Sequence, residues 1–483
     1  MCSFLSLLIA FALLSSVACA GITTAPAGEV AARADTSQCA VDAIWPPGPG
    51  SPLQSQPVQK DLEDILSQID PDRVKAIITK LVSFGTRHTL SSQTDPVRGI
   101  GAARDWIAAQ MREFAAAARK GTIVTVDVPS YIQQPTGSIL FAVNISNIIT
   151  TIQGVDEPDR VYIITGHYDS RVSSVDNFTD DAPGADDDAS GVAVAMELAR
   201  IMATRPPPRA TIMLGAVAGE EQGLFGSTFF AQEMKDAGKD VQGMFTNDIV
   251  GSPKGDDGFV DANGIRLFAQ GIPSTENATQ ISKRVSVGGE NDSPARQLAR
   301  HAHEVASNPT TEMNVRVVYR ADRFLRGGDH EPFLEQGFTA ARFTEPHENF
   351  AHQHQDVRVD STGKQFGDLI EFVDFNFIAR VAKVNGAAIW SLAQAPGTPT
   401  NVKIDASVLT NNSTLTWDLD SSPAVAEYEI VWRPTEEPFW TNFIPVGLVT
   451  KATVDISKDN AILGVRAVGK NGYKSPASFP FPA

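Results

Sequence analysis

Hydrophobic and polar positions repeat in two different ways along the chain, and the change falls near residue 395. Apolar residues recur at helical spacing over residues 61–81 and 101–118, which predicts amphipathic helices there. Further along, continuous apolar runs at 161–166, 211–217 and 243–248 are typical of strands buried on both faces of a sheet. Helical patterns lie between these runs, so the sequence predicts an α/β sandwich around a mostly parallel central sheet.

After a last helical stretch at 367–393 and a Pro- and Gly-rich linker at 395–399, the period changes to two. Alternating segments around Trp417, at 428–433 and at 462–468 predict a small β-sandwich. We therefore expect an α/β domain over residues 61–396 and a second domain over 397–483. The spacing of Trp417, Tyr428 and the turn at Asn471-Gly472 in the second domain resembles that of a fibronectin type III module.

The first 60 residues carry signals of processing. An apolar stretch ending in Ala18-Cys19-Ala20 predicts a signal peptide over residues 1–20, and thus a secreted, extracellular protein, with a retained anchor as the alternative. Residues 21–60 are rich in Pro, Gly, Ala and Ser and predict an irregular arm, with a cleavable pro-segment as a further possibility. Removal of the signal leaves Cys39 as the single cysteine of the mature chain, which excludes an intrachain disulfide.

Composition narrows the classes of function. The 483 residues carry a formal net charge of −17, which argues against attraction to nucleic acid or to an anionic membrane. No internal apolar run reaches the ~20 residues of a membrane-spanning helix. Six glycosylation sequons fit a secreted protein, and they begin at Asn144, Asn177, Asn277, Asn291, Asn411 and Asn412. Nothing in the sequence predicts the oligomeric state.

Acidic residues and histidines follow each of the predicted strands. His167 and Asp169 end the first strand, Glu220 and Glu221 follow the second, and Asp248 follows the third. Ligands of such sheets collect at the carboxyl ends of the strands, so these side chains are expected to converge.

Two further segments add to this set. Three adjacent carboxylates, Asp186 to Asp188, precede a predicted helix, where they repel one another unless a cation neutralises them. A distant loop contributes His354, with His347 and His352 nearby. Taken singly, the aspartates also fit a solvated turn at a helix start, and the histidines fit a plain surface. Taken together, mixed imidazole and carboxylate ligands favour zinc over magnesium or calcium.

The order and spacing of these segments resemble peptidase family M28, whose members use two zinc ions. The resemblance covers roughly residues 70–395 and rests on four motifs, GHYDS at 166–170, PGADDDASG at 183–191, GEEQGLFGS at 219–227 and ND at 247–248. It extends, with the signal peptide and the C-terminal module, to the secreted fungal zinc metalloproteases of that family.

The resemblance implies a role for each residue. One zinc ion is bound by His167 and Asp248, the other by Glu221 and His354, and both by Asp187. In the same resemblance, Asp169 orients His167, Glu220 is the general base for a zinc-bridged water, and the Asp187–Asp188 peptide bond is cis. The long loop between His167 and Asp187 is similar to that of the aminopeptidase members.

Some assignments stay open at this point. Residues 322–333 resemble the family's loop beside the site, where Asp329 and His330 support the ligands or an oxyanion, or else form a structural turn. Arg323 and Arg326 of this loop are candidates for binding a substrate carboxylate. The alternative functions are a glutaminyl-cyclase-like reaction at one zinc, and a non-catalytic protein whose C-terminal module binds a wall polymer or a protein partner.

Overall fold

The structure is a computed structural model that describes residues 45–420 and 422–483. The expected signal peptide, residues 21–44 of the expected arm, and Cys39 lie outside the described residues.

A mixed sheet forms the centre of the first domain. Within the described residues it has eight strands in the order β10-β9-β11-β8-β6-β7-β5-β2. The four central strands, β11, β8, β6 and β7, run parallel, and the pairs β9–β11 and β5–β7 on either side are antiparallel. The strands are β2 (Val124–Asp127), β5 (Ile148–Ile152), β6 (Glu157–His167), β7 (Ala210–Val217), β8 (Asp240–Asn247), β9 (Gly264–Ala269), β10 (Asn314–Val318) and β11 (Ala340–Thr344).

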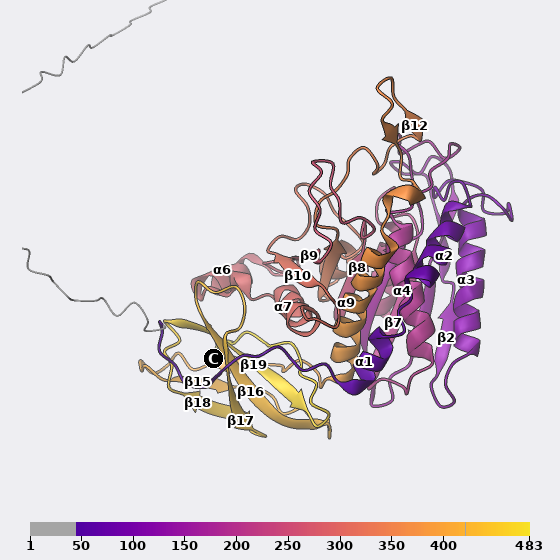
Figure 1. Cartoon of the computed structure of the whole chain (residues 1–483). Helices are drawn as coiled ribbons and strands as arrows, with labels where there is room; N and C mark the ends of the chain where they lie inside the picture. Colours follow the sequence, from indigo (N-terminus) through magenta and orange to yellow (C-terminus); the bar gives the residue numbers. More distant parts are fainter. Residues whose placement is uncertain (1–44, 421) are drawn as a thin grey trace, which may run out of the picture. The chain divides into compact units, whose positions relative to one another are not determined.

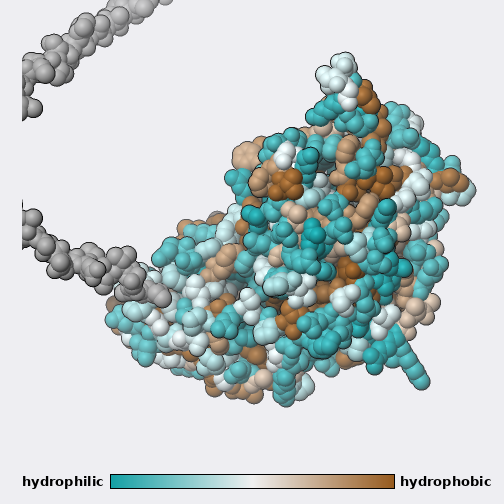
Figure 2. Space-filling model, in the orientation of Figure 1, coloured by the Kyte–Doolittle hydropathy of each residue, from teal (hydrophilic) through white to brown (hydrophobic). Residues whose placement is uncertain are grey.

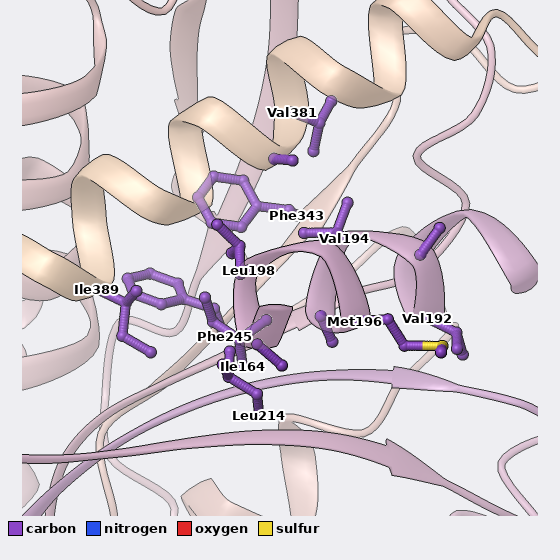
Figure 3. Close-up of a cluster of buried hydrophobic side chains, with 14 of the residues drawn as sticks. Ile164, Val192, Val194, Met196, Leu198, Leu214, Phe245, Phe343, Val381 and Ile389 are labelled. Carbon is purple, nitrogen blue, oxygen red and sulfur yellow. The ribbon is translucent and has the colours of Figure 1, made fainter. Parts of the chain in front are cut away.

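Helices cover both faces of this sheet, and Figure 1 shows α4 and α9 on one of them. Successive strand residues point to opposite faces, so Ile164 packs in one core with helices α4 and α9, and Ile163 packs in another with Phe230 and Phe333. Figure 3 shows the first of these cores, where side chains of α4 lie between the sheet and α9. The helices are α1 (Lys60–Leu66), α2 (Pro71–Val82), α3 (Ile100–Ala116), α4 (Ala189–Ala203), α5 (Phe225–Asp236), α6 (Ala278–Ser286), α7 (Pro294–Ala306), α8 (Glu331–Glu335) and α9 (Phe375–Gln394).

The last of these helices begins later than its apolar pattern predicts. The Asp374 side chain accepts hydrogen bonds from the backbone N–H groups of Asn376 and Phe377 at 2.9 and 3.0 Å. Such an N-cap stabilises the start of a helix, so α9 starts at Phe375 and not near residue 367. The preceding residues form a short 3₁₀ turn, η2 (Ile370–Phe372), and they include Asp368, which faces the candidate site.

The C-terminal residues form a β-sandwich. Two sheets, ordered β1-β17-β16-β19 and β18-β15-β14-β20, enclose a core that includes Leu415, Tyr428 and Val465. Its strands are β14 (Lys403–Ile404), β15 (Ser413–Thr416), β16 (Val425–Pro434), β17 (Asn442–Gly447), β18 (Lys451–Val454), β19 (Ala461–Gly469) and β20 (Phe481–Pro482). The likeness to a fibronectin type III module and the domain boundaries stay predictions.

Part of the expected N-terminal arm belongs to this sandwich. Strand β1 (Ser51–Pro52) pairs with β17, and the Trp432 side chain donates a hydrogen bond to the Pro49 carbonyl at 2.9 Å. Ion pairs join the sandwich to the first domain, including Arg433 with Asp292, two residues before α7, at 2.7 Å and Arg466 with Glu304 of α7 at 2.9 Å.

The remaining elements are short, and the surface is largely polar. The minor elements are β3 (Ser130–Gln133), β4 (Val143–Ser146), β12 (Arg358–Val359), β13 (Gln365–Phe366) and η1 (Gly289–Asn291). On the face shown in Figure 2, hydrophobic residues gather in small patches among hydrophilic ones. Over residues 45–420 and 422–483, no helix is long and apolar enough to cross a membrane. Among the sequon asparagines, Asn144 and Asn177 are half-buried, and the exposed ones are Asn277, Asn291, Asn411 and Asn412.

Candidate metal centre

The candidate ligands lie at the carboxyl ends of three neighbouring strands. His167 is the last residue of β6, Asp248 directly follows β8, and Glu220 and Glu221 lie just after β7. Because β6 lies between β7 and β8 in the sheet, these loops meet at one edge. Asp187 reaches the same place from the turn before α4.

The five predicted ligands form two groups joined by one carboxylate. The Nε2 atom of His167 lies 3.0 Å from Asp187 Oδ1 and 3.9 Å from Asp248 Oδ1. On the other side, Nε2 of His354 lies 2.8 Å from Asp187 Oδ2 and 3.1 Å from Glu221 Oε2. Asp187 thus presents a different oxygen to each histidine, which is the arrangement a bridging ligand requires.

Glu220 and Asp169 also lie in this cluster. The side-chain ligand atoms of His167, Glu220 and Asp248 all fall within 4.8 Å of one another. Nδ1 of His167 faces Asp169, 3.2 Å from its carbonyl oxygen and 3.5 Å from Oδ1. The same Asp169 carboxylate accepts hydrogen bonds from the backbone N–H groups of Glu220 and Glu221 at 3.3 and 3.1 Å. Asp169 is therefore placed to orient His167 and the glutamate loop together.

Buried polar contacts hold the turn that carries Asp187. The Asp368 carboxylate accepts hydrogen bonds from the backbone N–H groups of Asp186 and Asp187 at 2.9 and 2.8 Å. The fully buried Arg87 donates to the carbonyls of Pro183 and Gly184 at 2.6 and 2.8 Å. The peptide bond between Asp187 and Asp188 is cis, as the family resemblance implies.

Of the three histidines near residue 350, the structure brings His354 to the cluster. His352 stacks on Phe372 with ring centroids 3.6 Å apart, and the half-exposed His347 faces Asp257 at 3.4 Å. His354 has a left-handed backbone with φ of 53° and lies in a turn outside any helix or strand.

Burial and neighbouring charges shift the pKa values of Glu220 and Asp187 in opposite directions. Burial, and then the nearby Asp248 and Glu221, raise the pKa of Glu220 well above its ordinary value, although His167 opposes the shift. Burial acts in the same direction on Asp187, but His354 and His167 outweigh it and hold the pKa of this carboxyl well below its usual range.

The chemistry of the cluster fits a bound cation. Although burial lowers the pKa of His354, Glu221 and Asp187 raise it overall to about 10. Because Glu221 and Asp187 stabilise a positive charge between them, this position is suited to a metal cation. The buried Oε1 atom of Glu221 also has no hydrogen-bond partner among the described residues. Mixed imidazole and carboxylate donors of this kind suit zinc.

In the loop at 322–333, Asp329 and Asp322 have different surroundings. Asp329 is fully buried near the cluster, and burial raises its pKa to about 7. By contrast, Asp322 is paired with Arg342 and Arg323 at 3.2 and 2.9 Å. Asp322 also belongs to a third group of possible metal ligands, with His330 and Glu331, but its carboxylate is already paired with these two arginines. His330 is fully buried, like Asp329.

Several residues around the cluster were absent from the sequence-based expectations. Arg342 pairs with Asp248 at 2.8 Å, and Arg171 pairs with Glu221 at 2.8 Å and lies 2.5 Å from Nδ1 of His354. The one available signal was an arginine inside the apolar run Ala340–Thr344, because a buried guanidinium needs an anionic partner. For Arg171 the sequence held no such signal.

Residues 147–369 match the model of peptidase family M28. With the relatives described next, this match shows that the chain belongs to peptidase family M28, and its substrates are therefore peptides or proteins.

The chain is 54% identical over 457 residues to a "Probable zinc metalloprotease" of Pyrenophora teres f. teres (strain 0-1), covering 94% of each chain. It is also 54% identical over 450 residues to a protein of the same description from Pyricularia oryzae, covering 91% of this chain and 89% of that one. Among solved structures, the LapA aminopeptidase of Legionella pneumophila aligns with a TM-score of 0.49 at 18% identity, covering 71% of this chain and 77% of that one. A glutaminyl cyclase of Porphyromonas gingivalis aligns with a TM-score of 0.42 at 16% identity, covering 66% of this chain and 97% of that one.

Proposed function

We propose that this chain is an exopeptidase that holds two zinc ions and releases residues from the free amino end of peptides. The observation that carries the proposal is Asp187, whose two carboxylate oxygens face His167 on one side and His354 on the other. His167 and Asp248 would hold one ion, and Glu221 and His354 the other. The description of the relatives as probable zinc metalloproteases supports zinc as the metal.

The charges around the cluster favour the amino end of a substrate over the carboxyl end. A carboxypeptidase needs a free cation for the terminal carboxylate, and the sequence offered Arg323 and Arg326 for that role. In the structure both arginines are paired with Glu348, and Arg323 is also paired with Asp322. Both cations are thus engaged in ion pairs within the chain, whereas a free α-amino group meets a site rich in carboxylates.

The residues divide the work of hydrolysis between them. When bound, zinc ions polarise a scissile carbonyl and lower the pKa of water, so that hydrolysis proceeds near neutral pH. Glu220 would take up a proton from the attacking water and pass it to the leaving amine, since its carboxylate lies beside His167 and Asp248. Asp169 holds His167 and the backbone of the Glu220 loop in place.

A combined metal and substrate assay tests the proposal. Zinc-free chain is titrated with zinc, and its activity is measured on three reporter peptides, with a free amino end, a blocked amino end, or both ends blocked. We expect two zinc ions per chain and hydrolysis only where the amino end is free. Binding of a single zinc ion with cyclisation of amino-terminal glutamine, or cleavage of doubly blocked peptides, would contradict the proposal. Glu220→Gln serves as the control, because it should bind zinc normally without turnover.

We also propose that the protein is secreted and glycosylated, and that the signal peptide ends at Ala20. The apolar stretch of residues 2–20 and the four exposed sequon asparagines support this. Amino-terminal sequencing of the protein from culture medium, and its mass before and after removal of N-glycans, test the proposal. A protein retained in cells with residues 1–20 in place would contradict it.

A further inference from the structure

A continuous series of ion pairs leads from Asp248, just after β8, to Glu348 in the loop after β11. Arg342 lies 2.8 Å from Asp248 through Nη2 and 3.2 Å from Asp322 through Nη1. Arg323 continues the series, 2.9 Å from Asp322 through Nε and 3.5 Å from Glu348 through Nη1. These side chains are almost fully buried, with exposed fractions of 8% or less. The series therefore joins a proposed zinc ligand to Glu348, a carboxylate outside the candidate ligand groups of the described residues.

Glu348, at the end of this series, carries more positive partners than its single charge can balance. Arg266 lies 3.3 Å from Oε1, and both Arg323 and Arg326 face Oε2. Glu348 is only 6% exposed, so its charge is poorly screened by water. Without it, the guanidinium groups of Arg266, Arg323 and Arg326 would lack their shared counter-charge, and the turn that carries Arg323 and Arg326 would lose its ion pairs to the loop after β11.

This carboxylate is connected to His354 by a short path. With its amide nitrogen toward Glu348, Gln353 donates to Oε2 at 3.0 Å and accepts a hydrogen bond from Arg326 at 2.6 Å. The backbone N–H of Gln353 donates to the Asn349 carbonyl at 3.1 Å, which closes the turn. His354 is the next residue, and its left-handed backbone is one that a non-glycine residue adopts only when its surroundings hold it there.

The other end of the turn is held less firmly. Asp356 accepts a hydrogen bond from the Ser173 backbone N–H at 3.2 Å, and its own N–H donates to the Ser173 hydroxyl at 3.2 Å, and both contacts are exposed. Apart from Arg171, which lies 2.5 Å from Nδ1 of His354, the side-chain contacts that hold this turn are therefore more buried on the Glu348 side than at Asp356. Because contacts behind a metal ligand commonly change metal affinity by about 10–100-fold, a displaced turn should weaken a cation bound by His354.

We propose that Glu348, held by Arg323 and Arg326, is a positioning residue that fixes the turn carrying His354 and thereby sets the affinity for the cation shared by Asp187, Glu221 and His354. This inference rests on the proposed two-zinc function. Glu348 acts through the turn and does not touch the substrate.

The test is equilibrium zinc binding to the full chain, measured against a chromophoric chelator, for the wild type and for Glu348→Gln. The matched control is Glu304→Gln in α7, which removes the charge of a mostly buried glutamate that is 12% exposed and paired with Arg466 at 2.9 Å. We expect Glu348→Gln to bind the zinc ion of Asp187, Glu221 and His354 about 10–100-fold less tightly while the other zinc is unchanged. Glu304→Gln should bind both ions like the wild type.

A milder substitution keeps the test informative if Glu348→Gln does not fold. Arg326→Gln changes a side chain that is 32% exposed, and it should weaken the same zinc, whereas Arg326→Lys should restore much of the affinity because it keeps the charge. At saturating zinc, kcat of these variants should return close to the wild-type value, since the effect lies in metal affinity. A purely structural role would lower the melting temperature without changing either zinc affinity.

The outcomes separate this inference from the function on which it rests. A wild-type chain that binds fewer than two zinc ions contradicts the proposed function. A wild-type chain that binds two, with Glu348→Gln and Arg326→Gln both at wild-type affinity, contradicts only the role of Glu348. Equal weakening by Glu304→Gln would also overturn that role, because the effect would then be general.

Discussion

The two halves of the candidate metal centre are built from different kinds of backbone. His167 and Asp248 lie at the ends of buried parallel strands, with side chains exposed by 1% and 4%. His354, in the other half, is exposed by 24% and lies in a turn outside regular structure. The sheet fixes the first half through its backbone hydrogen bonds. In the second half Glu221 follows β7 and is 3% exposed, but His354 depends on the side-chain contacts of its turn. We therefore expect the halves to respond differently to substitution.

The largest effect should follow from removing the residue that belongs to both halves. Asp187→Ala should lose both zinc ions and lower kcat/KM by about 10⁴-fold or more, as when a whole catalytic unit is removed. Metal analysis of the gel-filtered protein and peptidase assays measure both changes. Retention of one tightly bound zinc ion would show that the halves are independent.

Glu220 tests the division between binding and chemistry. Glu220→Gln should keep both zinc ions and lower kcat by about 10²–10⁴-fold, because the amide cannot take up the proton. The check is single-turnover kinetics with zinc content measured on the same sample. A variant with normal zinc and a kcat within a few-fold of the wild type would exclude Glu220 as the general base.

Substitution of one histidine in each half compares the two halves directly. In His354→Ala the buried half is intact, so zinc should still stabilise the protein, by about 2.7 kcal/mol at a free concentration 100 times the remaining Kd. In His167→Ala, Asp187 and Asp169 lose their buried partner, so this variant should have the lower melting temperature without zinc. Thermal unfolding with and without zinc measures both effects. The reverse order of melting temperatures would contradict the difference between the halves.

The smallest effect is a dependence of stability on pH. Burial raises the pKa of Glu348, but Arg323 and Arg326 outweigh it and hold the pKa below the ordinary value of 4.5. A carboxyl with a depressed pKa contributes stability above its unfolded value, and the contribution is lost as the pH falls through the folded value. Glu348→Gln should therefore cost about 1–3 kcal/mol at pH 7 and progressively less below pH 4.5. Urea unfolding at pH 7, 5 and 3.5 measures this, and a cost independent of pH would argue against a role for the charge.

The difference between the halves also explains what the sequence predicts and what it does not. Strands of continuous apolar residues place their carboxyl ends at one edge, so the convergence of His167, Glu221 and Asp248 follows from pattern alone. His354 was singled out from three nearby histidines only through the family resemblance, because a turn has no periodicity to locate it. The late start of α9 depends on a local cap at Asp374, which apolar spacing does not register.

The supporting arginines were beyond prediction for a related reason. Arg342 and Arg87 form their contacts with groups far away in the chain, such as Asp248 and Pro183. Nothing in the local sequence names such partners. A charged residue within an apolar strand signals that a partner exists, but only the folded chain shows which one.

The most direct test of the two-zinc centre is a crystal structure of the zinc-loaded protein, with anomalous scattering recorded at the zinc edge. We expect two peaks about 3.5–4 Å apart on either side of the Asp187 carboxylate, one beside His167 and the other beside His354. A single peak, or peaks remote from Asp187, would contradict it.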